Sequence, residues 1–230
     1  MSALRTINQL CAPALPLTTA AVLATGWALH VRALHRSLGG DSLSGARRRP
    51  EFERLAHRII RRHQSEALLC VVDLDHFKTI NDTWGHEAGD AAIATTGARL
   101  ARWAGPGVVG RLGGDEFAAL IRVPAPAGDP TAAGRAHRQK LAELKHLLSQ
   151  PVDTPAGLMP VTASVGGASA HHLDVDELPL LLRAADQAMY RAKHRPHPAW
   201  AEQDDLTCHQ VNGRRQGRPG TALLVESQPA

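Results

Sequence analysis

Two aspartates at the end of a strand-forming run have the spacing to hold a divalent cation. Asp73 and Asp75 close the apolar run ALLCVVDLD, and side chains alternate along a strand, so both carboxylates project to the same face. Mg²⁺ prefers carboxylate oxygens and keeps several waters. A helix N-cap or a solvated strand end explains the same two residues, so this pair alone leaves the metal hypothesis open.

A second acidic pair follows two glycines. Asp115 and Glu116 come directly after Gly113-Gly114, between the strand-forming runs GVVGRL and EFAALIRV. Gly-Gly favours a two-residue hairpin turn because both positions tolerate positive φ, whereas Asp is disfavoured at the start of a strand. The bare backbone of the turn would also let a phosphate or a base approach closely. If the hairpin pairs beside the strand ending at Asp73, two carboxylates converge on one metal site, and two metals held there can clamp an in-line displacement at phosphorus.

A third polar group lies in the stretch NDTWGHEAGD. It contains Asn81 and Asp90, and an amide with a carboxylate can bind a guanine edge because the carboxylate accepts from N1–H and N2–H₂. Helix capping is the alternative interpretation for both residues.

Hydrophobic periodicity predicts the elements that position these residues. The order is helix, strand, helix, hairpin, helix, strand, helix, over residues 49–64, 67–75, 87–103, 107–123, 131–150, 159–170 and 174–194. This order predicts an α+β domain in which helices cover a central, mostly antiparallel sheet, related to the ferredoxin-like plan.

Composition divides the chain into three regions. Residues 1–38 are expected to form an N-terminal helical segment, residues 39–195 a globular domain, and residues 196–230 a disordered tail rich in Pro, Gly and Gln. No Asp, Glu, Lys or Arg occurs in 6–31, a stretch long enough to span a bilayer. Basic residues after it would then place the globular domain in the cytoplasm, anchored to the inner face of the membrane. Pro13 and Pro16 count against a membrane helix, so an amphipathic or dimerising helix stays open as the alternative.

The overall composition narrows the class of ligand. The chain is 43% hydrophobic and 21% charged, which predicts a packed core, and its net charge of +4 suits anionic substrates such as nucleotides. No basic stripe is interleaved with aromatic residues, which argues against nucleic-acid binding. The three cysteines are far apart and form no CxxC pair, which argues against a thiolate metal site and a disulfide framework.

Together the motifs resemble the GGDEF family of diguanylate cyclases. The resemblance rests on VVDLDHFKTINDTWGHEAGD followed by RLGGDEF, and it extends to PVTASVG, ADQAMYRAK and, loosely, DSLSGARRR, over residues 41–193. It implies the nucleotide-cyclase palm fold. It also implies that two GTP molecules, one on each of two facing domains of a homodimer, condense to cyclic di-GMP with loss of two pyrophosphates.

The resemblance also implies a role for each motif residue. Asp73, the Leu74 carbonyl and Asp115 would hold Mg²⁺ or Mn²⁺, and Glu116 would be a further metal ligand or help deprotonate the 3′-hydroxyl. Asn81 and Asp90 would bind guanine. The remaining residues would contact the rest of the substrate, with Lys78 also counted as catalytic: His76, Phe77, Lys78, Gly113, Gly114 and Lys193.

Three positions depart from the family pattern. His197 stands where the family usually has an Arg four residues after the lysine that corresponds to Lys193. AGPG at 104–107 replaces the R-x-x-D of the product site, which predicts no product inhibition there, and residues 43–46 form a softened entry motif. Two alternatives to an active cyclase therefore remain: a catalytically weak or inactive module that binds GTP or a protein partner, and a cyclase for another purine nucleotide.

Overall fold

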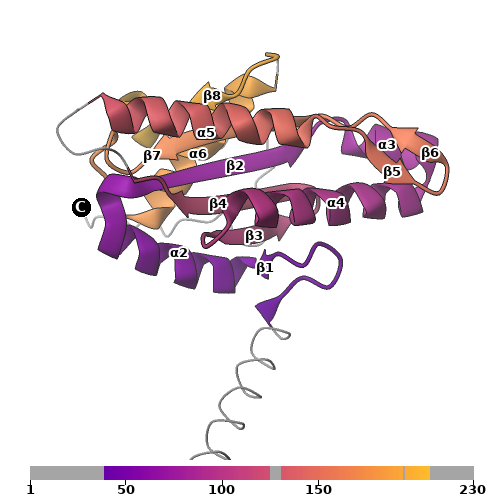
Figure 1. Cartoon of the computed structure of the whole chain (residues 1–230), viewed down its shortest axis with the longest axis horizontal. Coiled ribbons are helices and arrows are strands. Elements are labelled where there is room, and N and C mark those ends of the chain that lie inside the picture. The colour runs from indigo at the N-terminus through magenta and orange to yellow at the C-terminus, as the bar shows by residue number, and fades with distance from the viewer. Residues whose placement is uncertain (1–38, 125–130, 194, 208–230) are drawn as a thin grey trace, which may run out of the picture. The chain divides into compact units, whose positions relative to one another are not determined.

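A mostly antiparallel sheet forms the centre of the domain (Figure 1). The structure, a computed structural model, describes residues 39–124, 131–193 and 195–207. Within them a six-stranded sheet has the order β1-β3-β4-β2-β7-β8, and a two-stranded hairpin of β5 and β6 stands apart from it. The strands are β1 (Arg47–Arg48), β2 (Ala67–Leu74), β3 (Val108–Gly113), β4 (Glu116–Arg122), β5 (Val152–Thr154), β6 (Gly157–Met159), β7 (Ala163–Ser169) and β8 (Ala199–Trp200).

The inner strands pair antiparallel, and the two short edge strands join in parallel. β2 lies between β4 and β7, β3 pairs with β4, and β1 and β8 extend the sheet beside β3 and β7. The predicted α+β class with a central, mostly antiparallel sheet is confirmed.

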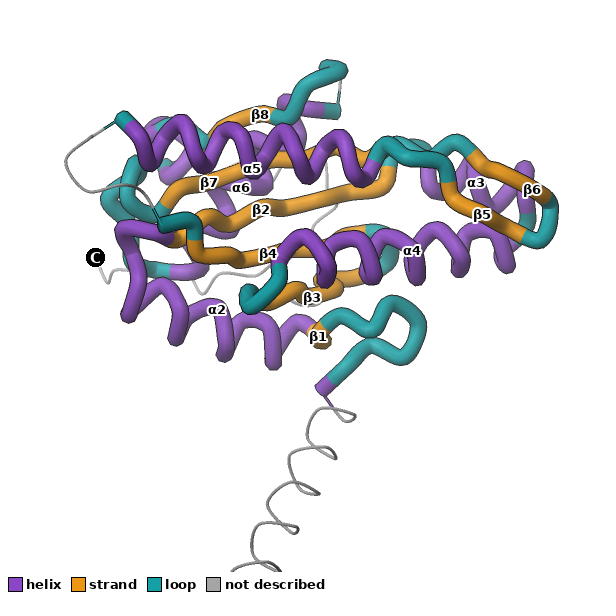
Figure 2. Tube along the Cα trace, in the orientation of Figure 1, coloured by secondary structure: helices purple, strands orange, loops and turns teal. Residues whose placement is uncertain are grey.

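Helices cover both faces of the sheet (Figure 2). They are α2 (Arg49–His63), α3 (Phe77–Trp84), α4 (His86–Ala104), α5 (Ala132–Leu148) and α6 (Leu178–Ala192), with short 3₁₀ turns η1 (Gln64–Glu66) and η2 (Gln203–Leu206). Two hydrophobic clusters result: one joins α4 and α5 to the sheet, and the other joins α2 and α6 to it. The continuous apolar sequence of β2 follows from this arrangement, because Leu68 and Cys70 face the first cluster while Leu69 and Val71 face the second.

Helix α6 lies unusually close to strand β7. A Cβ atom at Gly166 would stand closer than 3.0 Å to the Met189 nitrogen and the Ala185 oxygen, both main-chain atoms of α6. The absence of a side chain at Gly166 is therefore what permits this packing distance.

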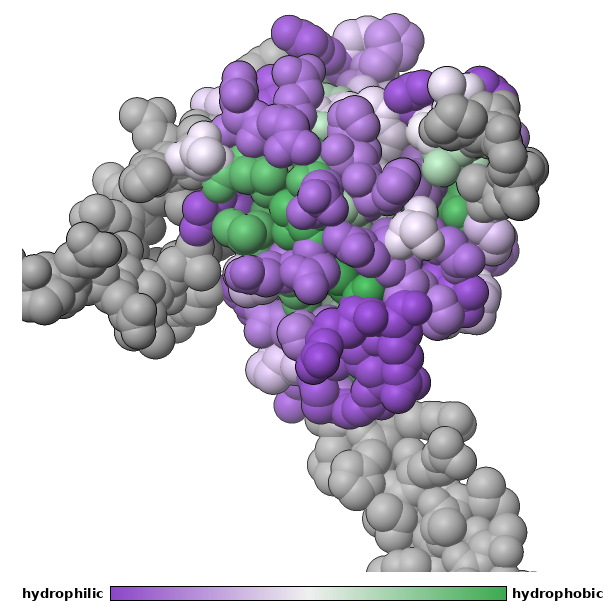
Figure 3. Space-filling view, turned by 90° about the vertical axis from the view of Figure 1, so that its left-hand side faces the viewer, coloured by the Kyte–Doolittle hydropathy of each residue, from purple (hydrophilic) through white to green (hydrophobic). Residues whose placement is uncertain are grey.

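Part of the apolar side of the molecule remains at the surface. Leu55, Ile59 and Leu182 pack against the cluster of α2 and α6 while staying partly exposed. Figure 3, which looks onto the left-hand end of Figure 1, shows hydrophobic side chains gathered in a patch with hydrophilic ones around it.

The ordered chain continues past the predicted end of the domain. Disorder was expected from residue 196, but β8 and η2 lie within residues 199–206. The Ala201 N–H donates to the Gly167 carbonyl at 2.8 Å, and Arg191 forms an ion pair with Asp205. The prediction was wrong for this stretch because these contacts to β7 and α6 compensate for its polar composition; residues 208–230 lie outside the described part.

Helix α3 and strands β1, β5 and β6 were not predicted. The N-terminal segment 1–38, with the membrane or dimerisation hypothesis for 6–31, falls outside the described residues. In the part of the chain that the structure describes, no helix is long and apolar enough to cross a membrane.

Candidate functional site

Strands β2 and β4 place two buried acids opposite each other. Asp73 and Glu116 are partners in the antiparallel register, and their exposed fractions are only 6% and 8%. Directly opposed residues project from the same face, here the face that α2 and α6 cover. Two carboxylates that are buried beside each other repel, and a nearby cation lowers the energy of this arrangement.

A lysine supplies one such positive charge. The Lys193 Nζ lies 3.0 Å from Asp73 Oδ1. Lys193 is the C-cap residue of α6, and α6 packs on the same face of the sheet. The structure thus brings together Asp73 and Lys193, which the sequence analysis assigned to the metal and to phosphate.

The glycine turn closes the site from the hairpin side. A tight turn is present, but it lies one residue later than predicted. Gly113 ends β3 and pairs with Glu116, so the two turn residues are Gly114 and Asp115, and of the two glycines only Gly114 has a positive φ, 48°. The Leu74 N–H lies 3.3 Å from the Asp115 carbonyl oxygen, so the end of β2 and the acidic end of the turn are adjacent. A Cβ at either glycine would meet no atom within 4 Å, which leaves open space for a substrate over bare backbone.

The hairpin contains one irregularity next to the turn. Arg111 pairs with Phe117, but Gly113 pairs with Glu116. Strand β3 therefore advances two residues while β4 advances one, which makes Leu112 the extra residue of a β-bulge.

Asp75 lies beside this site, on the face where it was expected with Asp73, because its side-chain partner Ser164 opposes Asp73 in the register of β2 with β7. Strand β2 ends at Leu74; beyond it the Asp75 N–H donates to the Thr162 carbonyl at 2.9 Å, and Asp75 Oδ1 accepts from Ser164 Oγ at 2.6 Å. Asp75 therefore binds the start of β7, next to the acidic pair.

The residues assigned to guanine lie on α3 and α4. His76 precedes α3 in the left-handed region, with φ 55°, and this turns the chain from β2 into the helix. The amide of Asn81 occupies the space over Gly89, where an added Cβ would stand closer than 3.0 Å to its Oδ1. Asp90 follows Gly89 and is exposed, so the predicted amide and carboxylate are neighbours across the two helices.

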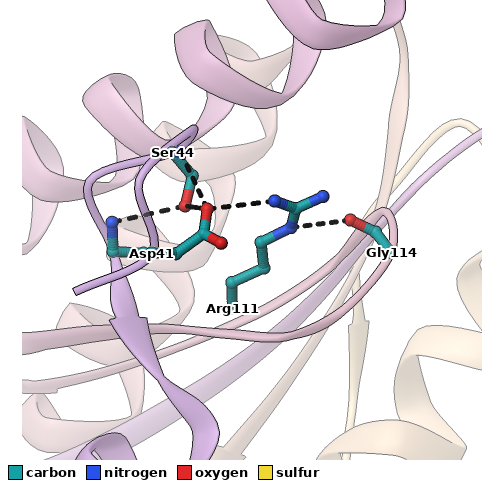
Figure 4. Close-up of polar contacts among 5 residues, drawn as sticks. Asp41, Ser44, Arg111 and Gly114 are labelled. Carbon is teal, nitrogen blue, oxygen red and sulfur yellow. Dashed lines mark hydrogen bonds and ion pairs between the residues drawn. The ribbon is translucent and has the colours of Figure 1, made fainter. Parts of the chain in front are cut away.

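A polar network that the sequence motifs did not indicate holds the turn (Figure 4). Arg111 Nε donates to the Gly114 carbonyl at 2.8 Å, and its Nη1 lies 3.0 Å from Asp41 Oδ1. Asp41 also accepts from the Ser44 hydroxyl at 2.6 Å and from the Ser44 N–H at 2.8 Å. The entry stretch and the glycine turn are therefore linked through one guanidinium; its only signal in the sequence was an Arg two residues before Gly-Gly.

This network carries a pH-dependent share of the stability. Burial alone raises the pKa of Asp41, but the hydrogen bonds from Ser44 and Arg111 and the charge of Arg111 outweigh it and lower the pKa to about 2. A carboxyl group with a depressed pKa stabilises the fold above its ordinary pKa, and this contribution is lost as the pH falls toward 2.

We expect Asp41→Asn to lower the free energy of unfolding by roughly 2 kcal/mol at pH 6. At pH 3 the difference from the wild type should be about half as large, because much of the Asp41 contribution has been titrated away. Urea unfolding of both proteins at the two pH values measures this, and a difference that stays constant would contradict the assigned pKa.

The acidic residues have the donor chemistry of a magnesium or manganese site. Asp73, the Leu74 carbonyl, Asp115 and Glu116 offer only oxygen atoms, which both cations prefer. Among the described residues no three His, Cys, Asp or Glu side chains are grouped to hold a metal ion by themselves. Mg²⁺ is usually bound by one or two carboxylates together with substrate phosphates.

Other predicted residues lie at the edge of this arrangement. Phe77 is half-buried and packs against the core cluster of α4 and α5. Lys78 and His197 are both exposed. Among the described residues, no hydrogen bond or ion pair joins either of them to the acidic pair.

Comparison with known proteins identifies the family of the chain. The family model described as "Diguanylate cyclase, GGDEF domain" matches residues 42–198. An uncharacterised 19.3 kDa protein of Streptomyces ambofaciens is 44% identical over 185 residues, covering 78% of this chain and 94% of that protein. The probable diguanylate cyclase DgcC of Escherichia coli K12 is 33% identical over 74% of this chain, which spans only 44% of the length of DgcC.

Solved structures show the same fold. The GGDEF domain of TpbB from Pseudomonas aeruginosa aligns with a TM-score of 0.60 and 32% identity, covering 72% of this chain and 96% of that one. The coiled coil and GGDEF domain of DgcB from Caulobacter crescentus, solved with c-di-GMP, aligns with a TM-score of 0.61 at 24% identity.

Proposed function

The chain belongs to the GGDEF family of diguanylate cyclases, and on that premise we propose that it condenses two GTP molecules into cyclic di-GMP and two pyrophosphates. The observation that supports this most is the buried pair of Asp73 and Glu116 beside Lys193 and the glycine turn. Acids that are buried against each other are costly unless cations neutralise them. A nucleoside triphosphate with its divalent cation is a ligand that suits such a site.

The proposed reaction is an in-line displacement at phosphorus. The 3′-hydroxyl of each GTP attacks the α-phosphorus of the other, a new P–O bond forms, and the bond to pyrophosphate breaks. Asn81 and Asp90 orient guanine, the Gly113-Gly114 backbone lies against the nucleotide, and Lys193 and Lys78 offset phosphate charge. In this proposal Glu116 accepts the hydroxyl proton or completes the metal site. Catalysis then rests mainly on positioning and charge neutralisation.

Mg²⁺ or Mn²⁺ would be held by Asp73, Asp115 and Glu116 with the Leu74 carbonyl. When bound, the metal supplies Lewis-acid stabilisation of charge that develops on the phosphate oxygens. Each domain holds one GTP in this scheme, so we propose that two chains must face each other for product to form.

Full-length protein incubated with GTP and Mg²⁺ tests the proposal, with cyclic di-GMP quantified by chromatography and mass spectrometry. We expect product formation with a rate per chain that rises with protein concentration, because the active species is a dimer. Product formed equally well from other purine triphosphates would favour a cyclase of different specificity.

One observation favours a second candidate, a module that binds GTP without turnover. His197 stands where the family usually carries an Arg, and it is exposed. Tight GTP binding with no cyclic di-GMP at high protein concentration would establish this alternative instead.

The contact of Asn81 with Gly89 gives a prediction about substrate binding. In Gly89→Ala the added methyl group would collide with the Asn81 amide, and we expect KM for GTP to rise about tenfold with little change in kcat. Steady-state kinetics measure this. Adding Gly89→Ala to an Asn81→Ala background should have little further effect on KM, since the displaced group is already gone; additive effects would argue against the guanine role.

A further inference from the structure

The chain beyond the family match folds back onto the domain. Residues 199–207, called the C-terminal strap here, follow the matched range 42–198. Strand β8 pairs with β7 at Gly166 and Gly167. The 3₁₀ turn that follows is closed by a capping box, in which the Glu202 N–H donates to Asp205 Oδ2 at 2.7 Å. The strap is thus fixed by main-chain pairing at one end and by an internal cap at the other.

Arg191 of α6 joins the helix to the strap. Its Nη1 and Nη2 donate to the two carboxylate oxygens of Asp205, the second at 2.8 Å, and Nη2 also donates to the Trp200 carbonyl at 2.7 Å. Asp205 is only 7% exposed. Such a two-pronged, charge-assisted pair sets orientation as well as distance, so the last turn of α6 is oriented by the strap.

Lys193 lies two residues after Arg191 and points elsewhere. Residues two apart on a helix are separated by about 200°, and Ala192 between them is 2% exposed. Arg191 therefore contacts the strap, while the Lys193 Nζ stands 3.0 Å from Asp73 Oδ1. The end of a helix tends to fray, so a clamp on one side of this turn limits the motion of the lysine on the other.

We propose that the C-terminal strap positions Lys193 for the triphosphate of GTP, with Asp205 acting through Arg191. This inference rests on the proposed function, which assigns Lys193 to phosphate. Asp205 touches no reacting atom and is a positioning residue. The strap also offers a physical reason why the chain tolerates His197: the lysine is held by a clamp on α6 rather than supported by a second cation after it.

The test compares Asp205→Asn with Asp204→Asn in the full-length protein. Asn keeps the size of Asp205 but removes its charge and one acceptor, whereas Asp204 is an exposed neighbour with no ion pair to Arg191. Binding of a non-hydrolysable GTP analogue is measured by calorimetry, and binding of guanosine by NMR. For Asp205→Asn we expect roughly tenfold weaker binding of the analogue and unchanged binding of guanosine. Asp204→Asn should match the wild type for both ligands.

Lys193→Met serves as the reference variant. It should weaken binding of the analogue at least as much as Asp205→Asn, and the double variant should be no weaker than Lys193→Met alone. If Asp205→Asn does not fold, Arg191→Lys replaces it, because lysine keeps the charge but cannot form the two-pronged contact.

The outcomes separate the strap from the proposed function. If Lys193→Met weakens binding of the analogue and Asp205→Asn does not, the strap inference is overturned and the proposed function stands. Equal losses for the analogue and guanosine would mean that the strap only stabilises the fold, which also overturns the inference. If Lys193→Met binds the analogue like the wild type, the assignment of Lys193 to phosphate falls, and the role of the strap falls with it.

Discussion

Replacing Asp73 by Asn is expected to reduce cyclic di-GMP formation by about 10³-fold, because a metal ligand stabilises the transition state by several kcal/mol. Asn has nearly the same size, but it is neutral and cannot hold a divalent cation as a carboxylate does. The change also leaves Lys193 without the negative partner that lies 3.0 Å from its Nζ. Initial rates at saturating GTP and Mg²⁺ measure the effect.

Asp75→Asn provides the matched control for this variant. Asp75 lies close to the acidic pair, and its carboxylate accepts a hydrogen bond from Ser164 Oγ. An Asn oxygen can accept the same bond. We expect this variant to retain activity close to that of the wild type. An Asp73→Asn enzyme within tenfold of the wild type would refute the metal role of Asp73.

The second large effect concerns stability. Gly166→Ala should lower the free energy of unfolding by about 3 kcal/mol, at the upper end of the usual cost of overpacking. The added methyl group would press on main-chain atoms at Met189 and Ala185, which no change of rotamer can move aside. For a domain of this size the melting temperature should fall by roughly 6–12 °C.

Gly134→Ala is the control, because the same substitution there adds a methyl group without a clash. The nearest atom to a Cβ there is Arg138 Nη2 at 3.5 Å, an ordinary contact, and Gly134 lies inside α5. Alanine favours a helix interior, so we expect a gain of about 0.5–1 kcal/mol. Thermal and urea unfolding of both variants measure the contrast, and a loss in both would show that the packing of α6 on β7 is not the cause.

Local sequence patterns predicted the elements whose hydrophobic period is strong. The buried run of β2 and the helical spacing of α2, α4, α5 and α6 each identify their element without tertiary information. Helix α3 escaped prediction because its sequence FKTINDTW is short and polar and begins after His76 in a left-handed conformation. Strands of two or three residues, such as β1 and β5, have too few residues to show alternation.

Contacts between distant parts of the chain could not be predicted from sequence. The motif residues were identified, yet nothing local indicates that Lys193 reaches Asp73 or that Arg111 joins Asp41 to the glycine turn. The segment after residue 196 was predicted to be disordered from its composition, but composition does not reveal that Arg191 has a partner in Asp205. Long-range ion pairs of this kind depend on sheet register and helix direction, which only the folded chain sets.

The bulge at Leu112 also determines which kinds of change the signature hairpin can absorb during evolution. Because Leu112 is the extra residue, its removal would close the bulge and leave Arg111 opposite Phe117 and Gly113 opposite Glu116. A one-residue deletion inside β4 would instead shift its register against β2 and turn the side chains on one side of the deletion to the opposite face. The bulge is therefore the place where the hairpin can lose one residue without changing its faces, whereas the length of β4, which is paired with β3 on one side and β2 on the other, should stay constant.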